Sequence, residues 1–581
     1  MSAMLPTISP DRDVDAGVRT GEADLWCTYA AVRTLRWLGA ADVTPDPVGT
    51  AACLSSRRNA DGGYAWTRGM TADAWATFYC TETLVDLAAG NRESLRGIDR
   101  TADWLRSCRA DDGGFAMTPG QGSDAWATFY VTRTLAGACG QRVDTKRLRD
   151  WLGALQTPHG GLAWSPAHAA RGDADVRACF YGVMAWRAAG APDEPAPWDA
   201  AALRGWLCEQ QDAAGGFRFS PNADIPCLWA TYRATCALAA LDDGPAHAES
   251  CISWILDRRG PGGGFRRWEG YDVEDVWAAF CAVGSLRALG RRLESADRRS
   301  TVGSIQQMAC PGGGFTYRER ERAADALATA STALAEPQAA ETAGHRRWLD
   351  GCLLPKEGGL MYMPARGAEV RCTLWGLEAG AVSEPASRRG VGDWVSRLQN
   401  PDGRLGYWEG RGSDVVNTAS ALEIDRLIGG SPIDRTAVGA FLASCRAADG
   451  FGYGNVPDAE RSALRPTLQA MRAGLLLGRA SAFSISAVLA RHEVAGGGWA
   501  NEGNRLPDLL TTYEVVLCAD RHGVTIDLEH AARVVERLAV DGGAAWTPLA
   551  ALDGGPLARC LHTLLQRRLR EDVPLPGLAL S

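Results

Sequence analysis

A glycine turn recurs along almost the whole chain, and this repeat limits the possible fold more than any other feature. Single or paired glycines stand about every 45 to 55 residues. An aromatic residue follows most of them directly, as in Gly62-Gly63-Tyr64 and Gly113-Gly114-Phe115. Glycine can adopt a positive φ angle and end a helix, while the ring fills the space between units. The repeat therefore predicts stacked helical units.

Each turn separates two kinds of predicted helix. The segment before a turn is amphipathic, as in 98–109 and 147–156, and is expected in an outer layer. The segment after a turn is rich in small and apolar residues, as in 73–84 and 124–135, and is expected in an inner layer. About twelve inner helices are expected, starting near Asp24, Asp73, Asp124, Asp175, Asp224, Asp272, Ala323, Glu369, Asp414, Asp458, Asp508 and Asp553.

Twelve inner helices correspond to two rings of six. The sequence thus predicts an all-α protein of two (α/α)6 double-walled barrels, built from about eleven to twelve helix–glycine-turn–helix repeats. A length of 581 residues also favours two domains over one core. We expect a flexible polar tail at 1–22, a first barrel at 23–295 and a second at 296–581, with an alternative boundary near 244. An open solenoid of helix pairs is the alternative architecture.

Composition argues against a membrane-spanning, a secreted or a nucleic-acid-binding protein. Hydrophobic residues make up 46% and charged residues 22% of the chain, and no apolar run approaches the ~18 residues of a membrane-spanning helix. The first 23 residues lack the apolar core of a signal peptide, so a cytoplasmic location is expected. A net charge of -8 without a basic, aromatic stripe argues against nucleic acid as a partner. The oligomeric state is not readable from this pattern.

Cysteine and tryptophan are the two unusual residue types. The 17 cysteines form no CxxC pair and lie in apolar helical stretches, which favours buried thiols over a disulfide or zinc framework. Tryptophan outnumbers phenylalanine by 21 to 12. Five tryptophans stand near inner-helix starts and are expected to cluster at a barrel mouth: Trp26, Trp75, Trp126, Trp229 and Trp277. Indole faces can stabilise a cation, although packing between helices is an equally simple explanation.

The repeat resembles that of a known superfamily. Residues 398–403 (Leu-Gln-Asn-Pro-Asp-Gly) followed by Tyr407-Trp408, and residues 59–66 (Asn-Ala-Asp-Gly-Gly-Tyr-Ala-Trp), resemble repeats of squalene-hopene cyclases, class II diterpene cyclases and protein prenyltransferase β subunits. The likeness covers nearly the whole chain. It implies α/α barrels that hold an isoprenoid among aromatic rings, with the five tryptophans as substrate-binding residues.

The same resemblance suggests a catalytic acid. Class II cyclases protonate an alkene or epoxide with the middle carboxyl of a DxDD motif at an inner-helix start. The nearest match is 272–275, Asp-Val-Glu-Asp. By resemblance Glu274 is the general acid, with Asp272 and Asp275 as its carboxylate partners. Crowded carboxylates in a partly dry site can hold the proton that an alkene must receive. This sequence departs from the family by having Glu at the acid position and Val276-Trp277 where Thr-Ala is usual.

Two observations on this motif leave its role open. Asp24, Asp73, Asp124 and Asp275 stand at the same distance before a leucine of their helix, so Asp275 also fits a repeated N-cap. If the two rings divide evenly, the motif lies in the last unit of the first barrel. In the cyclases it lies early in the second.

The resemblance predicts a protonation-initiated terpene cyclase, of the isomerase or lyase type. Its substrate would be a linear isoprenoid such as geranylgeranyl diphosphate, whose diphosphate is not ionised. Arg266 and Arg267 could receive that diphosphate together with Mg²⁺. A non-catalytic barrel that binds an isoprenoid or a protein is the alternative. A prenyltransferase β-like subunit is less favoured, since no inner helix contains Asp-x-Cys and Asn417 stands where that family has a zinc-binding His. No zinc or other protein-held metal is expected.

Overall fold

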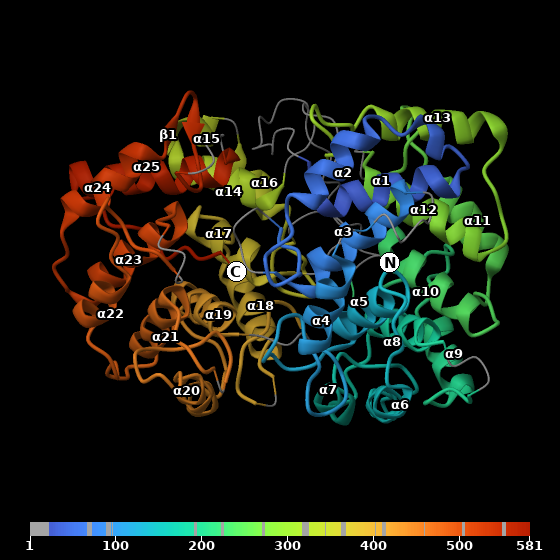
Figure 1. Cartoon of the computed structure of the whole chain (residues 1–581), viewed down its shortest axis with the longest axis horizontal. Helices are drawn as coiled ribbons and strands as arrows, with labels where there is room; N and C mark the ends of the chain where they lie inside the picture. Colours follow the sequence, from blue (N-terminus) through green and yellow to red (C-terminus); the bar gives the residue numbers. More distant parts are fainter. Residues whose placement is uncertain are drawn as a thin grey trace. The chain divides into compact units, whose positions relative to one another are not determined.

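The computed structural model shows a chain of helices that divides into two compact units. It describes residues 23–580 except 67–71, 89–94, 96, 191–193, 222, 224–225, 270–273, 317–324, 343, 362–367, 401, 410–413, 458, 502–505 and 549–553. The first unit extends from Gly21 to Ala323, and the second contains Ala324–Ser581. Each unit is described by itself below. Figure 1 labels their elements.

The described part of the first unit has six inner helices. They are α1 (Leu25–Trp37), α3 (Ala74–Leu87), α5 (Ala125–Ala136), α8 (Val176–Ala188), α10 (Leu228–Ala240) and α12 (Val276–Ala288). Each packs on the next, and α12 packs on α1, so they form a closed circuit. The outer layer consists of α2 (Pro47–Ser55), α4 (Ile98–Ser107), α6 (Thr145–Gly153), α9 (Ala200–Glu209), α11 (Ala248–Leu256) and α13 (Ser295–Gln306), with η1 (Ala41–Val43) and α7 (Pro166–Arg171) in the connections.

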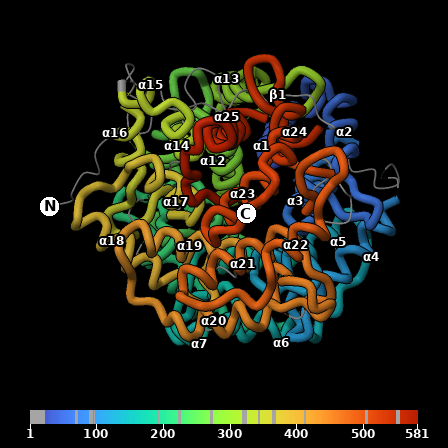
Figure 2. The backbone as a smooth tube through the Cα atoms, turned by 90° about the vertical axis from the view of Figure 1, so that its left-hand side faces the viewer, coloured from blue at the N-terminus to red at the C-terminus, as the bar shows by residue number. Residues whose placement is uncertain are grey.

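The second unit repeats this plan. Its inner helices, within the described residues, are α14 (Ala326–Ala335), α17 (Val370–Glu378), α19 (Val415–Ile428), α21 (Leu464–Leu476), α23 (Leu509–His522) and α25 (Gly555–Glu571). Here α25 packs on α14 and closes the circuit. The remaining elements are α15 (Pro337–Thr342), α16 (His345–Asp350), α18 (Pro385–Arg397), α20 (Arg435–Ser444), α22 (Ile485–His492), α24 (Leu528–Arg537) and an antiparallel pair, β1 (Ala539–Val540) and β2 (Gly543–Ala544). Figure 2 traces the backbone of these helices with the colours of the sequence.

Helix starts follow the predicted pattern. Asp24 accepts a hydrogen bond from the Cys27 amide at 3.0 Å, Asp124 from the Ala127 amide at 2.8 Å and Asp275 from the Ala278 amide at 2.8 Å. A carboxylate at this position satisfies an amide that has no partner within its own helix. The all-α, double-layered fold class predicted from the repeat is confirmed, and Asp275 is one of its regular N-caps.

At each glycine turn, one helix–turn–helix repeat packs on the next repeat. Gly62 has φ +104°, and a Cβ there would lie 2.4 Å from the carbonyl carbon and oxygen of Arg100 in the following outer helix. Only glycine permits this approach. The amide of Tyr64 then donates to Thr77 Oγ1 at 3.0 Å on the following inner helix. Turn, outer helix and inner helix are thereby tied together.

The division between units falls after Ala323, later than the predicted 295 and far from the alternative near 244. The reason is how the first circuit closes. Helix α13 packs on both α1 and α12. The turn that follows it also returns to α1, because the Phe315 amide donates to Thr28 Oγ1 at 3.0 Å and the Asp24 amide donates to the Phe315 carbonyl at 3.0 Å.

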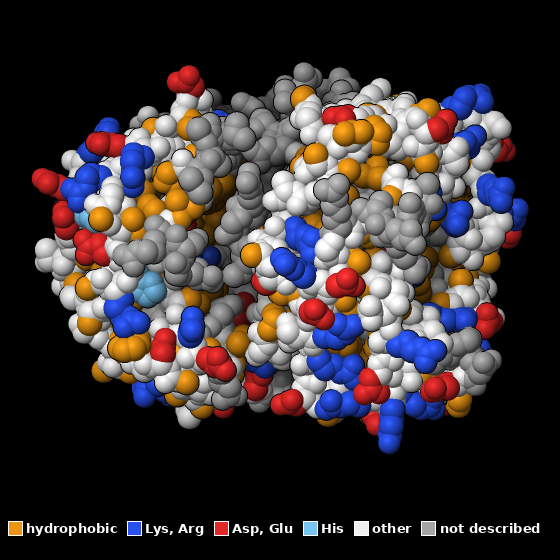
Figure 3. All heavy atoms as spheres, in the orientation of Figure 1, with side chains coloured by type: hydrophobic (Ala, Val, Ile, Leu, Met, Phe, Trp, Pro, Cys, Tyr) orange, Lys and Arg blue, Asp and Glu red, His pale blue; other side chains and the backbone are white. Residues whose placement is uncertain are grey.

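Three further properties concern both units. Among the helices that the structure describes, none combines the length and apolarity needed to cross a bilayer. On the face drawn in Figure 3, acidic and basic side chains of the described residues are interspersed. The 17 cysteines are all free thiols, and most are buried.

Candidate functional site

The five tryptophans singled out in the sequence lie together in the first unit. The ring centroids of Trp26 and Trp277 are 4.6 Å apart, those of Trp75 and Trp126 are 4.5 Å apart, and those of Trp26 and Trp229 are 5.6 Å apart. The last pair joins α1 to α10, which are separated in the circuit by α12, so these indoles meet inside the ring. All except Trp75 are at most 4% exposed. This contact pattern supports a packing role for the cluster.

A second aromatic layer continues deeper into the same ring. The hydroxyls of Tyr79 and Tyr130 are 3.2 Å apart, and burial raises the pKa of both groups well above its usual value. Arg233, only 3% exposed, donates to the Tyr181 hydroxyl at 2.9 Å and lies 4.6 Å from the centre of the Trp229 ring. Cation–π contacts and the hydroxyl compensate the buried charge.

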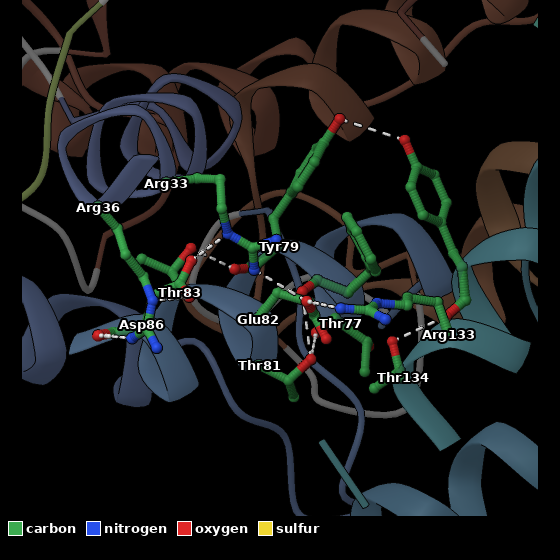
Figure 4. Close-up of polar contacts among 12 residues, drawn as sticks. Arg33, Arg36, Thr77, Tyr79, Thr81, Glu82, Thr83, Asp86, Arg133 and Thr134 are labelled. Carbon is green, nitrogen blue, oxygen red and sulfur yellow. Dashed lines mark hydrogen bonds and ion pairs between the residues drawn. The ribbon is translucent and has the colours of Figure 1, made fainter. Parts of the chain in front are cut away.

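An ion-pair cluster that sequence reasoning missed joins three inner helices of the first unit (Figure 4). Arg33 of α1 bonds to Asp86 and, at 2.9 Å, to Glu82 of α3, while Arg133 of α5 lies 3.4 Å from Glu82. Burial raises the pKa of Asp86, against the opposing effect of Arg33. The neighbouring charges lie between adjacent helices, where they hold the circuit together.

The described residues of the predicted acid motif, Glu274 and Asp275, have separate partners. Asp275 forms a buried ion pair with Arg267, whose side chain is 3% exposed, and also caps α12. Arg266 donates to the Arg259 carbonyl at 2.9 Å. Arg267, one of the two predicted diphosphate ligands, is therefore engaged by a carboxylate within the protein. Asp272 lies outside the described residues.

Glu274 has a structural position that the repeat explains. Its Oε1 accepts from the Gly262 amide at 2.7 Å, and its Oε2 accepts from the Gly264 amide at 2.6 Å. In other turns an aspartate within the turn accepts the equivalent amide, as Asp112 does from Gly114 at 3.0 Å. Gly262 stands at that aspartate's place. Glu274 supplies the missing carboxylate from the facing segment, so its geometry favours turn formation over acid catalysis.

A different carboxylate, in the second unit, is buried and accepts hydrogen bonds from two side chains. Glu369 stands at the N-cap position of α17 but makes no capping hydrogen bond, and it is 0% exposed. Its Oε2 accepts from the Tyr407 hydroxyl at 2.6 Å, and its Oε1 accepts from the Cys372 thiol at 3.0 Å. The Arg371 guanidinium lies 3.4 Å away. The additional methylene of Glu takes its carboxylate past the amides that an Asp would cap.

Neighbouring groups extend this cluster. Asp325, 1% exposed, caps α14 on one side. The pKa of the Cys372 thiol is raised by burial, by the charge of Glu369 and, to a lesser extent, by the charge of Asp325. On the other side, the Tyr407 and Trp408 rings lie 5.0 Å apart. The sequence signal that could have revealed the cluster is a Glu in a register that most other inner helices fill with Asp. Within the part of the chain that the structure describes, no group of three or more His, Cys, Asp or Glu could hold a metal ion.

Comparisons with known proteins give a family and several similar chains. The model of the prenyltransferase alpha-alpha toroid domain matches residues 15–164, 71–195, 164–349 and 322–488. The β subunit of protein farnesyltransferase from Pisum sativum is 25% identical over 113 residues, which are 19% of this chain and 26% of that protein. The chain thus spans about a quarter of the length of this curated relative.

Three solved structures are similar at low identity. The ent-copalyl diphosphate synthase from Streptomyces platensis is 14% identical, with 98% of both chains covered and a TM-score of 0.45. A type II terpene cyclase from Scytonema is 15% identical over 48% of this chain and 92% of that chain, with a TM-score of 0.34. Protein geranylgeranyltransferase-I from Candida albicans is 13% identical over 60% of this chain and 86% of that chain, with a TM-score of 0.26.

Proposed function

Because the chain belongs to the prenyltransferase alpha-alpha toroid family, we propose that it is a protonation-initiated terpene cyclase whose acid is Glu369 in the second unit. The observation that carries this proposal is the buried, non-capping carboxylate of Glu369 beside the Tyr407 hydroxyl. The earlier candidate, Glu274, is held by two turn amides. We therefore move the acid to the second unit.

The chemistry follows from the donors around Glu369. In its protonated form the carboxyl transfers a proton to the terminal alkene carbon of a folded polyene, which leaves a tertiary cation. The carboxylate that remains is stabilised by the Arg371 guanidinium, the Tyr407 hydroxyl and the Cys372 thiol, and this stabilisation makes the acid stronger. Ring closure moves the cation along the chain. Loss of a proton to a base, or capture by a water that then releases a proton, ends the reaction and balances the charge.

Aromatic rings near the acid suit such cations. The Trp408 ring packs edge to face with Tyr407 and can stabilise positive charge that passes close to its negative face. The Tyr407 ring already lies 4.9 Å from the Arg371 guanidinium. The proposed substrate is a linear prenyl diphosphate such as geranylgeranyl diphosphate. Its diphosphate would keep its bond to carbon and would carry any Mg²⁺ itself, since phosphate oxygens are good ligands of that ion.

A non-catalytic barrel is the second candidate function. The observation that favours it is the dense aromatic packing in the first unit, where Trp26 contacts Trp229 across the ring interior. In that case the second unit would bind an isoprenoid or a protein segment without converting it.

The test compares wild type with Glu369→Gln and Glu274→Gln. Each protein is incubated with Mg²⁺ and farnesyl diphosphate, geranylgeranyl diphosphate or squalene, and the dephosphorylated products are identified by mass spectrometry. We expect Glu369→Gln to lower cyclisation by about 100-fold or more, because general acid catalysis typically contributes that much. Glu274→Gln should keep the chemistry. Loss of product in Glu274→Gln alone would return the acid to the first unit.

A further inference from the structure

The segment that follows the last helix enters the ring of the second unit. Helix α25 ends at Glu571, and Asp572 reverses the chain with a φ of 56°. The following residues become buried, with Leu575 6%, Leu578 0% and Ala579 1% exposed. We call residues 572–580 the C-terminal segment.

Side chains of the inner helices hold the backbone of the C-terminal segment. Its carbonyls accept from Tyr513 at 2.7 Å (Pro576), from Trp375 Nε1 at 3.0 Å (Ala579) and from Arg472 at 3.2 and 3.3 Å (Gly577 and Leu578). The Gly577 amide donates to Glu378 at 2.8 Å. The side chains that make these contacts stand on α17, α21 and α23. They belong to the inner layer, so the segment lies on the interior side of the ring.

The direction of the segment is also defined. Its Gly577 amide meets Glu378, at the end of α17. Three residues later, the Leu580 carbonyl accepts from Arg465, near the start of α21. Inner helices separated by one returning outer helix run parallel, so their starts lie at one end of the ring. The segment therefore passes through the interior toward the end at which Glu369 stands.

We propose that the C-terminal segment is an autoinhibitory plug, which has to withdraw before an isoprenoid can occupy the second ring. This inference rests on the proposed function of that ring. An extended chain carrying Leu575, Leu578 and Leu580 presents isobutyl branches along a narrow backbone, much as a polyprenyl chain presents methyl branches. An interior that accommodates the leucine side chains of this segment is therefore suited to the methyl branches of a polyprenyl chain. Pro574 and Pro576 favour an extended backbone and lower the entropy lost on insertion.

Gly577 offers a way to displace the plug. A Cβ at this position would lie 2.4 Å from Glu423 Oε1 and 2.5 Å from Glu423 Cδ. Glu423 cannot move aside easily, since it is fixed by ion pairs with Arg426 at 2.6 Å and Arg521 at 3.1 Å. A side chain at 577 therefore opposes insertion. Val573 precedes the buried part and is 42% exposed, which makes Val573→Ser a matched control within the same segment.

The experiment measures release of the plug and ligand binding separately. Amide hydrogen exchange of Leu575 and of residues 577–580, and calorimetric binding of geranylgeranyl diphosphate, are recorded for wild type, Gly577→Val and Val573→Ser. We expect Gly577→Val to exchange about tenfold faster in the segment and to bind the ligand about tenfold more tightly. Val573→Ser should match wild type. Circular dichroism melting shows whether each variant remains folded, and Trp375→Phe, which removes one bond to Ala579, provides a milder second release variant.

The outcomes separate this inference from the proposed function. Faster exchange with unchanged ligand affinity in both release variants overturns the plug, because the ligand then does not compete for the same space. Unchanged exchange in both variants overturns it as well. Release with tighter binding but no cyclised product supports the plug and contradicts the cyclase, leaving a regulated binding barrel.

Discussion

The role of a carboxylate at an inner-helix start depends on its side-chain length and register. Asp275 at the N-cap reaches the Ala278 amide of its own helix. Glu274, one residue earlier, reaches the amides of the glycine turn. Glu369, at the N-cap with one more methylene, reaches Tyr407 instead. The repeated caps could be predicted because Asp is a common N-cap. The partner of Glu369 could not, since Tyr407 lies on the next repeat.

Replacing Glu369 by Asp keeps the carboxylate but shortens the side chain, so it tests whether contact with Tyr407 is required. We expect Glu369→Asp to lower cyclisation nearly as much as Glu369→Gln, because the shorter side chain would cap the Cys372 amide and lose the Tyr407 hydroxyl. The new cap should keep or raise thermal stability, by up to about 1 kcal/mol. Product analysis and melting measure the two effects. Full activity of Glu369→Asp would show that reach to Tyr407 is unimportant.

The buried pair of Asp275 and Arg267 supports a prediction about stability. Removing one partner leaves an uncompensated buried charge, so we expect Arg267→Met to destabilise the first unit by about 3 kcal/mol. The double variant Arg267→Met, Asp275→Asn keeps an acceptor for the Ala278 amide and should recover part of this loss. Denaturant unfolding followed by hydrogen exchange in α12 measures it. Equal losses in the single and double variants would argue against coupling between the two residues.

Three histidines with lowered pKa values should make the folded chain less stable at acidic pH. Burial lowers the pKa values of His492, His522 and His562 in the folded chain. Below about pH 6.5 the unfolded chain binds protons at these residues before the folded chain does, so stability falls as pH drops through that value. We expect His562→Gln, which can still donate to the Val535 carbonyl, to weaken the pH dependence of the melting temperature. An unchanged slope would contradict this assignment.

At the scale of elements, the glycine turn explains why the repeat could be recognised from sequence. Each turn needs a positive φ and a close approach to the next outer helix, and both requirements leave a visible glycine. The starts of most inner helices were therefore predicted to within four residues, but α21 begins at Leu464 and not near Asp458. The end of the first unit was not, because α13 and Phe315 close the circuit through contacts with α1, far earlier in the chain. The repeat pattern within one segment of sequence does not show which distant segment it will contact.

A pair of glycines tests this account of the turn. Gly62→Ala should destabilise the first unit by several kcal/mol, since its Cβ would lie 2.4 Å from the Arg100 carbonyl. Gly190 also has a positive φ, of 73°, but its Cβ would meet nothing within 4 Å. Gly190→Ala should therefore cost only about 1 kcal/mol of backbone strain. Similar losses in the two variants, measured by denaturant unfolding, would remove the steric explanation.

At the scale of the whole molecule, two closed circuits share one plan but differ in what fills them. The first contains an aromatic core in which Trp26 meets Trp229. The second contains the C-terminal segment, held by Arg472 and Tyr513. The sequence predicted that the tryptophans would cluster. It could not show whether they surround a cavity or fill the interior of the first ring, because that depends on distances across the ring. Residues 572–580 have no helical or repeat pattern, so their insertion gave no local signal.

One measurement tests both the acid role of Glu369 and the access of substrate to the second ring. Cyclised product from geranylgeranyl diphosphate and Mg²⁺ is quantified by mass spectrometry in Gly577→Val, and in that variant combined with Glu369→Gln or with Glu274→Gln. We expect product from Gly577→Val and from its combination with Glu274→Gln, and a loss of about 100-fold or more when Glu369→Gln is added. Equal product with and without Glu369→Gln, or none from a folded Gly577→Val protein whose C-terminal segment exchanges freely, would contradict a cyclase with its acid in the second ring.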